Sequence, residues 1–403
     1  MSRHKPFLIK HATVYAENCT YEDGFIAVSN GKIEAMGSAA SISSSLRHKD
    51  YDIFDAQGKF AVIPGMIDVH IHGAGGADTM DATPEALETM KQVLPREGTT
   101  SFLATTITQS GESIEKALRN AASCIRHQSA ENAELLGIHL EGPFISPKRA
   151  GAQPLQFIQH PDIETFKKWQ QISDNTIKLV TLAPEEKNGL ELIKFLNKSN
   201  IVASIGHSDA TFVQVDEAIS AGAAHVTHLF NGMRGMHHRE PGTAGAALTR
   251  DELYVEIIAD GIHVHPEMIK LAYKSKSCKK IILITDSIRA KWLNLVTSEL
   301  GGQTVTVKDG KALLPDGTLA GSILKMNTAI QNFKKFTNCS IEEIIEMTSV
   351  NPAKQLNIFD RKGSLKLGKD ADLVVVDQTL DVQMTYCKGT LAYQKGEEDR
   401  KWN

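Results

Sequence analysis

Short apolar runs alternate with amphipathic stretches of helical period along most of the chain, from about Phe60 onward. The alternation extends over roughly 300 residues and repeats about eight times. The runs are too apolar to have one face in water, which is typical of parallel strands covered by helices. Eight strand and helix alternations favour a closed (β/α)8 barrel over an open sheet. The expected strands are GMIDVHIHG, TSFLATT, ELLGIHLEG, TIKLVTLAPE, NIVASIGHSD, AHVTHLFNGM, LYVEIIADGIHV and KIILITDS.

Helices are expected between and after these runs, where apolar residues recur every three or four positions. The expected helices are PEALETMKQVLPREG, SIEKALRNAASCIRHQ, DIETFKKWQQIS, LELIKFLNKSN, FVQVDEAISAG, PEMIKLAYKSK, SILKMNTAIQNFKKF and SIEEIIEMTSVNPAKQL.

The two ends of the chain depart from this pattern and have strand character. FLIKHATVYAE and GFIAVSNGKIEAMG open the chain, and Asn30-Gly31 lies where a tight hairpin turn is needed. The segments GSLKLGKDADLVVVD and VQMTYCKGTLAY close it. We therefore expect the ends to pair in a small discontinuous β-sandwich domain, residues 1–62 and 360–403, beside a barrel domain of residues 63–359.

Size and charge narrow the class of partner. The chain has 403 residues, 41% of them hydrophobic, and a formal net charge of −4. This length supports a real core, and the scattered basic residues form no footprint for nucleic acid or a membrane surface. A small-molecule partner is expected, with no nucleic acid and no membrane.

The cysteines and the N-terminal segment bear on the compartment. The five cysteines lie far apart, and their number is odd. This usage is typical of reduced thiols in a cytoplasm. Because no apolar run reaches the length of a signal sequence or the roughly 18 residues of a membrane span, a cytoplasmic protein is expected.

His70 and His72 stand one residue apart in the first expected barrel strand. Side chains at i and i+2 of a strand point the same way, so both could bind one ion. The pair alone fits equally well with a simpler interpretation, in which one histidine is packed in the core and the other is solvated.

Four further residues change that balance because each ends another apolar run: Glu141, His207, His228 and Asp286. The carboxyl ends of barrel strands meet at one mouth, where active sites are built. Nitrogen and oxygen ligands without sulfur suit a catalytic Zn²⁺ or Fe²⁺ ion. The sequence therefore predicts a divalent metal site at the mouth of the barrel.

Several segments resemble a known family. PGMIDVHIHG resembles the opening metal motif of the amidohydrolase superfamily, and GSLKLGKDADLVVVD resembles its closing β segment. Within that superfamily the chain resembles the N-acetylglucosamine-6-phosphate deacetylases, in order from about residue 58 to residue 377. The segments that carry this closer resemblance are GIHLEGPFISPKRAGAQP, SIGHSDAT, THLFNGM, REPGTAGAAL, IADGIHV, ITDSIRA and LAGSILKM.

The resemblance implies a metal site with two ions per subunit, Zn or Fe. Glu141, His207 and His228 would form the principal site, and His70 and His72 would hold a second ion beside it. A divalent ion activates water and polarises an amide carbonyl.

Asp286 would be the catalytic residue. It would take a proton from the attacking water and pass it to the departing sugar nitrogen. The alternative is a structural role, as the N-cap of a helix after the strand.

The resemblance also implies substrate contacts. Arg239 would bind the phosphate from a glycine-bounded loop, helped by main-chain groups of Asn231 and Gly232. His263 would contact the sugar hydroxyls. The plainer alternatives are a solvated basic loop for the phosphate segment and a satisfied core histidine for His263.

Further residues are expected around the substrate. Leu319, Ala320 and Gly321 would form a loop over it, although an ordinary turn into a helix explains most of that segment. Gln153 stands where some members of the family have a histidine that polarises the acetyl carbonyl. Trp292 departs from the usual pattern and could reshape one wall of the pocket.

The implied activity is metal-dependent hydrolysis of N-acetylglucosamine-6-phosphate to glucosamine-6-phosphate and acetate, in amino-sugar metabolism. The implied assembly is a homodimer in which a neighbour's residues close the phosphate site. One rival is an amidohydrolase for cyclic amides or dipeptides, against which the Arg239 loop argues. The other is a barrel that has lost catalysis and serves in binding, against which the complete ligand set argues.

Overall fold

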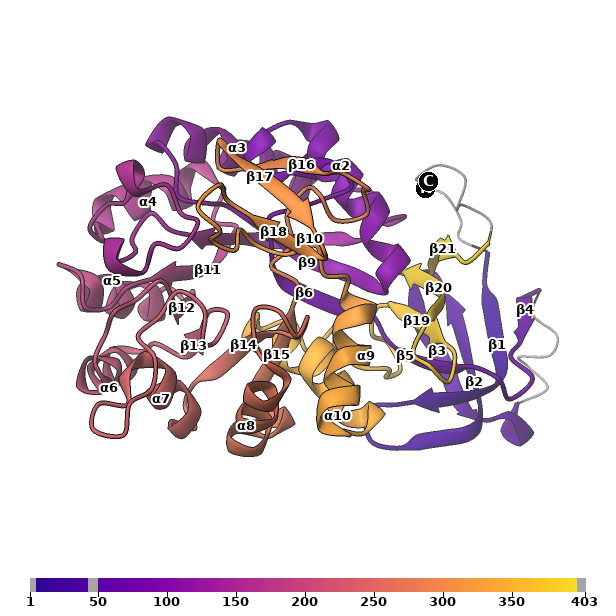
Figure 1. The fold of residues 1–403 in the computed structure, drawn as a ribbon. Coiled ribbons are helices and arrows are strands. Elements are labelled where there is room, and N and C mark those ends of the chain that lie inside the picture. Colours follow the sequence, from indigo (N-terminus) through magenta and orange to yellow (C-terminus); the bar gives the residue numbers. More distant parts are fainter. Residues whose placement is uncertain (1–4, 43–49, 397–403) are drawn as a thin grey trace.

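The computed structural model describes residues 5–42 and 50–396. Its central feature is a sheet of eight parallel strands in which each strand lies beside its predecessor in the chain (Figure 1). The strands are β6 (Met66–Ile71), β9 (Thr99–Thr105), β10 (Glu134–Glu141), β11 (Ile177–Leu182), β12 (Val202–Ile205), β13 (His225–Val226), β14 (Tyr254–Ile258) and β15 (Ile281–Ile284).

The sheet closes into a barrel because β15 returns to β6. The backbone N–H of Asp286 donates to the carbonyl of His70 at 2.9 Å, and the N–H of His72 donates to the carbonyl of Ser287 at 2.9 Å. Every residue of β6 and of β9 is buried, as expected of strands covered on both faces. The predicted fold class, a (β/α)8-type barrel with a separate β unit at the chain ends, is confirmed.

A helix follows each barrel strand in the chain. Several begin at a side-chain N-cap, where Thr83, Ser110 and Thr211 each accept a backbone N–H of the first turn. The helices are α2 (Pro84–Val93), α3 (Gly111–His127), α4 (Ile163–Ile172), α5 (Gly189–Lys198), α6 (Phe212–Ala221), α7 (Gly242–Thr249), α8 (Pro266–Lys276), α9 (Met326–Thr337), α10 (Ile341–Ile345) and α11 (Asn351–Gln355), with the π-helical segment η7 (Glu346–Val350) between the last two.

Helix α7 was not among the predicted helices. Its sequence GTAGAALT is buried in seven of eight positions, from Gly242 through Leu248. A helix buried on all sides has no polar face, so no amphipathic period reveals it.

The two ends of the chain form one sheet. β5 (Ala61–Pro64) pairs with β1 (Phe7–Tyr15) on one side and antiparallel with β19 (Leu373–Val376) on the other, which joins the N-terminal strands to the C-terminal ones. The sheet order is β21-β20-β19-β5-β1-β2-β3, with β4 beside β1. The remaining strands are β2 (Thr20–Ser29), β3 (Lys32–Ser38), β4 (Asp52–Asp55), β20 (Val382–Cys387) and β21 (Thr390–Gln394).

The predicted hairpin turn lies between β2 and β3. Asn30 and Gly31 have φ angles of 51° and 75°, the left-handed conformation that a tight two-residue turn requires. The division into domains at residues 62 and 360 stays a prediction. Residues 1–4, 43–49 and 397–403 of the predicted small domain lie outside the described residues.

A small antiparallel sheet is inserted between β15 and α9, and the hydrophobic pattern did not predict it. It contains β16 (Thr297–Leu300), β17 (Gln303–Lys308) and β18 (Lys311–Leu313). In Figure 1 it is drawn in orange above the barrel. The Gln303 side chain donates to the carbonyl of Ala152 at 2.7 Å, and the Gln109 side chain donates to the carbonyl of Gly301 at 3.1 Å. The insertion is therefore fixed to the loops that follow β9 and β10.

Short elements complete the described chain. They are β7 (Gly73–Ala74), β8 (Ala77–Asp78), η1 (Ala39–Ser41), η2 (Thr79–Asp81), η3 (Leu94–Glu97), η4 (Pro147–Arg149), η5 (Leu155–Phe157) and η6 (Cys278–Lys280). Within the described residues, none of the helices combines the length and the apolar character that crossing a membrane needs.

Candidate active site

The predicted ligand residues meet at the carboxyl ends of the barrel strands. Glu141 is the last residue of β10, and the other members of the group end or follow β6, β12, β13 and β15. Among the described residues, potential ligand atoms gather in three groups, and the atoms of each group lie within 4.8 Å of one another: Glu141, His207 and His228; His70, His72 and Asp286; and His70, His139 and Glu256. The first two groups consist entirely of residues predicted for the site.

The first group brings three lone pairs to one point. His207 Nε2 lies 3.2 Å and His228 Nε2 3.1 Å from Glu141 Oε1, and the two nitrogens are 3.1 Å apart. The opposite ring nitrogens, both Nδ1, lie 2.8 Å from the carbonyl of Arg149 and 3.1 Å from the carbonyl of Asn231. A carbonyl only accepts, so each Nδ1 carries the proton and each Nε2 offers its lone pair.

The second group is arranged around two carboxylates. His70 Nε2 and His72 Nε2 each lie 3.4 Å from Asp286 Oδ1. The same two nitrogens lie 3.5 Å from Glu141 Oε1 and 3.2 Å from Glu141 Oε2, respectively. The Glu141 carboxylate therefore lies between the two groups and could ligate an ion in each.

This donor set fits a divalent cation. One proton cannot satisfy two facing ring nitrogens and a carboxylate oxygen at once, whereas a metal ion accepts all three lone pairs. His70 Nε2 is buried and has no hydrogen-bond partner, as a ligand atom would. The ligands are imidazole and carboxylate, which suit Zn or Fe and leave positions open for water or substrate.

The electrostatics of the site point to the same need for positive charge. Burial disfavours ionisation of Glu141, but the facing histidines hold its pKa well below the usual value. Burial also opposes ionisation of Asp286, whose pKa His70 and His72 nevertheless lower. Against burial, the two carboxylates raise the pKa of His72 to about 9. Two ionised carboxylates in a buried site are stable only with cations beside them.

Three of these residues have strained backbones. The φ angles of His207, His228 and Asp286 are 48°, 30° and 48°. Non-glycine residues rarely adopt positive φ, and such strain persists where the surroundings fix it, often at functional sites. Here each residue turns the chain at the end of a barrel strand and directs its side chain across the mouth. Asp286 does not cap a helix, because the next helix in the chain is α9.

A cavity of about 200 Å³ opens over the two ligand groups. Of the predicted substrate residues, Gln153, Asn231, Gly232, His263, Leu319 and Gly321 line it. Ala320 is buried and is not among the lining residues. His263 is held in place by Asp260, whose Oδ2 lies 2.6 Å from His263 Nδ1.

Both polar atoms of the Gln153 side chain form hydrogen bonds within the protein. Its amide nitrogen donates to Glu141 Oε2 at 2.8 Å, and its oxygen accepts from the backbone N–H of Thr108 at 2.8 Å. This arrangement orients the Glu141 carboxylate. Gly232 has a packing role, because a Cβ on it would lie 2.9 Å from His207 Nδ1.

Arg239 is exposed, and it is not among the residues that line the cavity of its own chain. Its Nη1 lies 2.6 Å from His238 Nε2. Trp292 is also absent from the lining; it packs against Arg96 and Lys325 and donates its indole N–H to Glu97 Oε2 at 3.2 Å. The expectation that Trp292 could reshape one wall of the pocket stays a prediction, since its ring contacts Arg96 and Lys325 and not the cavity directly.

Several residues of the site were missed from the sequence. Ile107, Leu300 and Thr318 line the cavity from segments that carried no motif. Asp260 had a signal, since it stands three residues before His263 in IADGIHV. Glu256 had another: it is the one charge within the apolar strand YVEII, which predicts a buried partner.

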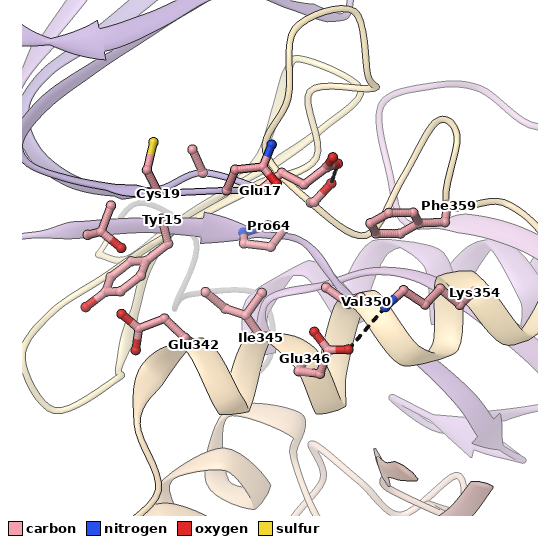
Figure 2. Close-up of a pocket in the computed structure, with 14 residues that line it drawn as sticks. Tyr15, Glu17, Cys19, Pro64, Glu342, Ile345, Glu346, Val350, Lys354 and Phe359 are labelled. Atoms are coloured by element: carbon pink, nitrogen blue, oxygen red, sulfur yellow. Dashed lines mark hydrogen bonds and ion pairs between the residues drawn. The ribbon is translucent and has the colours of Figure 1, made fainter. Parts of the chain in front are cut away.

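A second cavity, of about 510 Å³, lies between β1 and α10. Figure 2 shows Tyr15 and Glu342 at one end of it and Lys354 and Phe359 at the other. No histidine lines it, and Lys354 Nζ lies 3.2 Å from Glu346 Oε1. It therefore lacks the converging histidine ligands of the smaller cavity, which is the better candidate for chemistry.

Comparison with known proteins places this chemistry in a family. Residues 61–392 match the amidohydrolase family. The chain belongs to the amidohydrolase family. It is a hydrolase, and the catalytic chemistry of this family depends on bound metal, which agrees with the two groups of ligands at the barrel mouth.

The similar proteins found include several deacetylases that are named for one substrate. An N-acetylglucosamine-6-phosphate deacetylase of Bacillus subtilis is 51% identical over 396 residues, which is 98% of both chains. One of Lysinibacillus sphaericus is 44% identical over 96% of this chain and 98% of the relative. The structure of a mutant Mycobacterium smegmatis enzyme in complex with N-acetyl-D-glucosamine-6-phosphate matches with a TM-score of 0.89 and 28% identity, over 97% of this chain and 100% of that one. The predicted family is confirmed.

Proposed function

We propose that this protein hydrolyses the N-acetyl group of N-acetylglucosamine-6-phosphate and releases glucosamine-6-phosphate and acetate, in amino-sugar metabolism. One observation carries the proposal: four of the five predicted ligands, together with Asp286, line one cavity in a chain that is 51% identical over 396 residues to a deacetylase of that substrate.

The ligand groups support binding of two divalent ions per chain, Zn or Fe. Glu141, His207 and His228 would hold the first, and His70 and His72 would hold the second, with Glu141 between them. Ions bound there would lower the pKa of water from about 15.7 to about 7 and stabilise the negative charge that develops on the acetyl oxygen.

Asp286 would carry the protons. Because its pKa is lowered, the carboxylate is ionised at neutral pH and can accept a proton from the attacking water. The water oxygen adds to the acetyl carbon, the carbon–nitrogen bond breaks, and Asp286 returns the proton to the sugar nitrogen. The products are acetate and a free amine.

The remaining lining residues would bind and orient the sugar. Asp260 fixes the ring of His263, which can hydrogen-bond a hydroxyl group. Main-chain groups of Asn231 and Gly232 would bind the phosphate side, and the Leu319–Gly321 segment would cover the substrate. Gln153 would act through Glu141, since both ends of its amide have protein partners.

The position of Arg239 supports a homodimer. Its side chain does not line the cavity of its own chain, and the neighbouring His237 and His238 help to line an apolar hollow of about 730 Å³ together with Phe212, Met236 and Leu271. Met236 is 46% and Val213 63% exposed. A second copy covering this face would bury these side chains and bring Arg239 to the neighbour's phosphate subsite.

The homodimer has a direct test. Arg239→Ala and Asp286→Asn should each be nearly inactive alone. Mixed under conditions that exchange subunits, they should recover activity, since a hybrid dimer contains one site with an intact Asp286 and a partner's Arg239. If Arg239 served its own chain, mixing would recover nothing.

The proposed reaction is tested by acetate release from N-acetylglucosamine-6-phosphate with the Zn²⁺-loaded protein. N-acetylglucosamine, a dipeptide, a cyclic amide and a chelator-treated sample are run beside it. Turnover of the phosphorylated sugar that the chelator abolishes is expected. Turnover of only the dipeptide or the cyclic amide would overturn the substrate assignment, and no turnover by a folded, metal-loaded protein would overturn the enzymatic one.

A further inference from the structure

A buried glutamate that does not itself line the cavity connects the two ligand groups. Glu256 lies in the middle of β14 and has no exposed surface. Its Oε2 lies 2.9 Å from His70 Nδ1 and 3.0 Å from the backbone nitrogen of His228. Its Oε1 lies 3.1 Å from His225 Nε2. One carboxylate thus contacts β6, β13 and the turn after β13.

The contact with His70 sets which ring nitrogen carries the proton. An ionised carboxylate only accepts hydrogen bonds, so His70 Nδ1 is the donor. The lone pair of Nε2 is then left to face Glu141 and Asp286, at 3.5 and 3.4 Å. Without an acceptor at Nδ1, the proton could move to Nε2 and block it as a ligand.

The contact with His228 fixes a strained turn. His228 has a φ angle of 30°, and a conformation of this kind needs support from its surroundings. The bond from its backbone N–H to Glu256 supplies that support at the residue whose side chain faces Glu141 and His207. The same oxygen atom therefore holds one member of each ligand group.

The carboxylate is itself held from the far side. His225 Nδ1 lies 3.2 Å from the amide nitrogen of Gln355 on α11. An amide N–H donates to that ring nitrogen, so the proton of His225 is on Nε2 and points at Glu256. Each of the three N–H groups that face the carboxylate then has a defined acceptor.

We propose that Glu256 is a positioning residue that keeps His70 in its ligating tautomer and couples binding at the two ion sites. This inference rests on the proposed metal-dependent function. It concerns affinity for the ions, which can be measured without substrate.

The test is the affinity and stoichiometry of Zn²⁺ binding, from competition with a chromophoric chelator, in five variants. Glu256→Met keeps the length but cannot accept a hydrogen bond, so both binding events should weaken by about 10- to 100-fold. Glu256→Gln keeps an oxygen that can accept from His70 and His228, so it should stay within about 10-fold of the wild type. His72→Ala should weaken only one event.

Glu256→Asp separates position from charge, and it also serves if Glu256→Met fails to fold. The shorter side chain keeps its charge but withdraws from His70 and His228, so it should weaken binding more than Glu256→Gln does. The matched control is Glu134→Gln. Glu134 is also a glutamate with ion-pair partners, but it lies at the amino end of β10, far from the ligand Glu141 at the carboxyl end, so the change should leave Zn²⁺ affinity unchanged.

Different results of the Zn²⁺-binding experiment would overturn different parts of the proposal. Unchanged affinity in folded Glu256→Met or Glu256→Asp would overturn the proposal, and weakening of a single event in both variants would overturn the coupling. A wild-type protein that binds two Zn²⁺ ions but releases no acetate would overturn the proposed substrate and leave this inference standing.

Discussion

Strand β10 has a glutamate at each end, and the two have opposite surroundings. At the amino end, Glu134 is surrounded by cationic side chains: Lys362, Arg361 and Lys388 lie 2.8, 3.0 and 3.1 Å from its Oε2. Burial opposes its ionisation, but these cations lower the pKa of Glu134 to about 2.

At the carboxyl end, Glu141 faces only imidazole rings and the amide of Gln153. Its surroundings contain no lysine or arginine within ion-pair distance among the described residues. The protein therefore supplies permanent positive charge to one end of the strand and offers lone pairs at the other. The ion pairs around Glu134 stabilise the fold. The lone pairs around Glu141 are fully used only when a cation is bound.

The largest effect should come from the site that Glu141 shares with Asp286 at the carboxyl ends of the barrel strands. Asp286→Asn removes the proton carrier, so kcat should fall by about 10²- to 10⁴-fold while the melting temperature and the number of bound Zn²⁺ ions stay close to wild type. Steady-state acetate release, calorimetry and elemental analysis measure the three quantities. A variant that kept its kcat would assign the proton transfer to another group.

Removal of metal should come next. A ligand at about 100 times its dissociation constant adds about 2.7 kcal/mol to the stability of the folded state, so a chelator should lower the melting temperature of the wild type. A His207→Ala, His228→Ala double variant should be much less sensitive to the chelator. Equal sensitivity in both proteins would mean that the ions bind elsewhere.

A change at the amino end should cost stability and spare activity. Glu134→Gln leaves the buried Lys362 without one of its carboxylates, and the loss of charged hydrogen bonds should lower the free energy of unfolding by about 1.5–3 kcal/mol. At a temperature where the variant is folded, kcat should be unchanged. A large fall in kcat would show that the two ends of β10 are not independent.

The smallest effect is a difference in pH dependence. The pKa of Glu134 falls from its ordinary value of 4.5 to about 2 on folding, so its contribution to stability is full above pH 4.5 and disappears as the pH falls toward 2. The difference in unfolding free energy between wild type and Glu134→Gln should shrink over that range. Urea titrations at successive pH values measure it, and a constant difference would contradict the ion-pair origin of the effect.

Much of this molecule could be predicted from its sequence. All eight barrel strands and the Asn30-Gly31 turn lie where short-range patterns put them, because burial on both faces and left-handed turn residues leave local signals. Helix α7 and the inserted sheet of β16, β17 and β18 were not predicted. The first has no polar face, and the second takes its place from contacts with distant loops.

For the site, the residue types at the strand ends, and with them the available ligands and the available acid, follow from the sequence alone. What each of these side chains faces depends on the tertiary structure. Closure of β15 onto β6 brings Asp286 beside His70, the loop after β10 turns Gln153 toward Glu141, and the exposed loop carries Arg239 out of its own cavity. Glu256 reads in the sequence only as a charge in an apolar strand, and its three partners come from β6, β13 and the turn after it. Local patterns record burial and turns, whereas hydrogen-bond partners far apart in the chain are set only when the barrel closes.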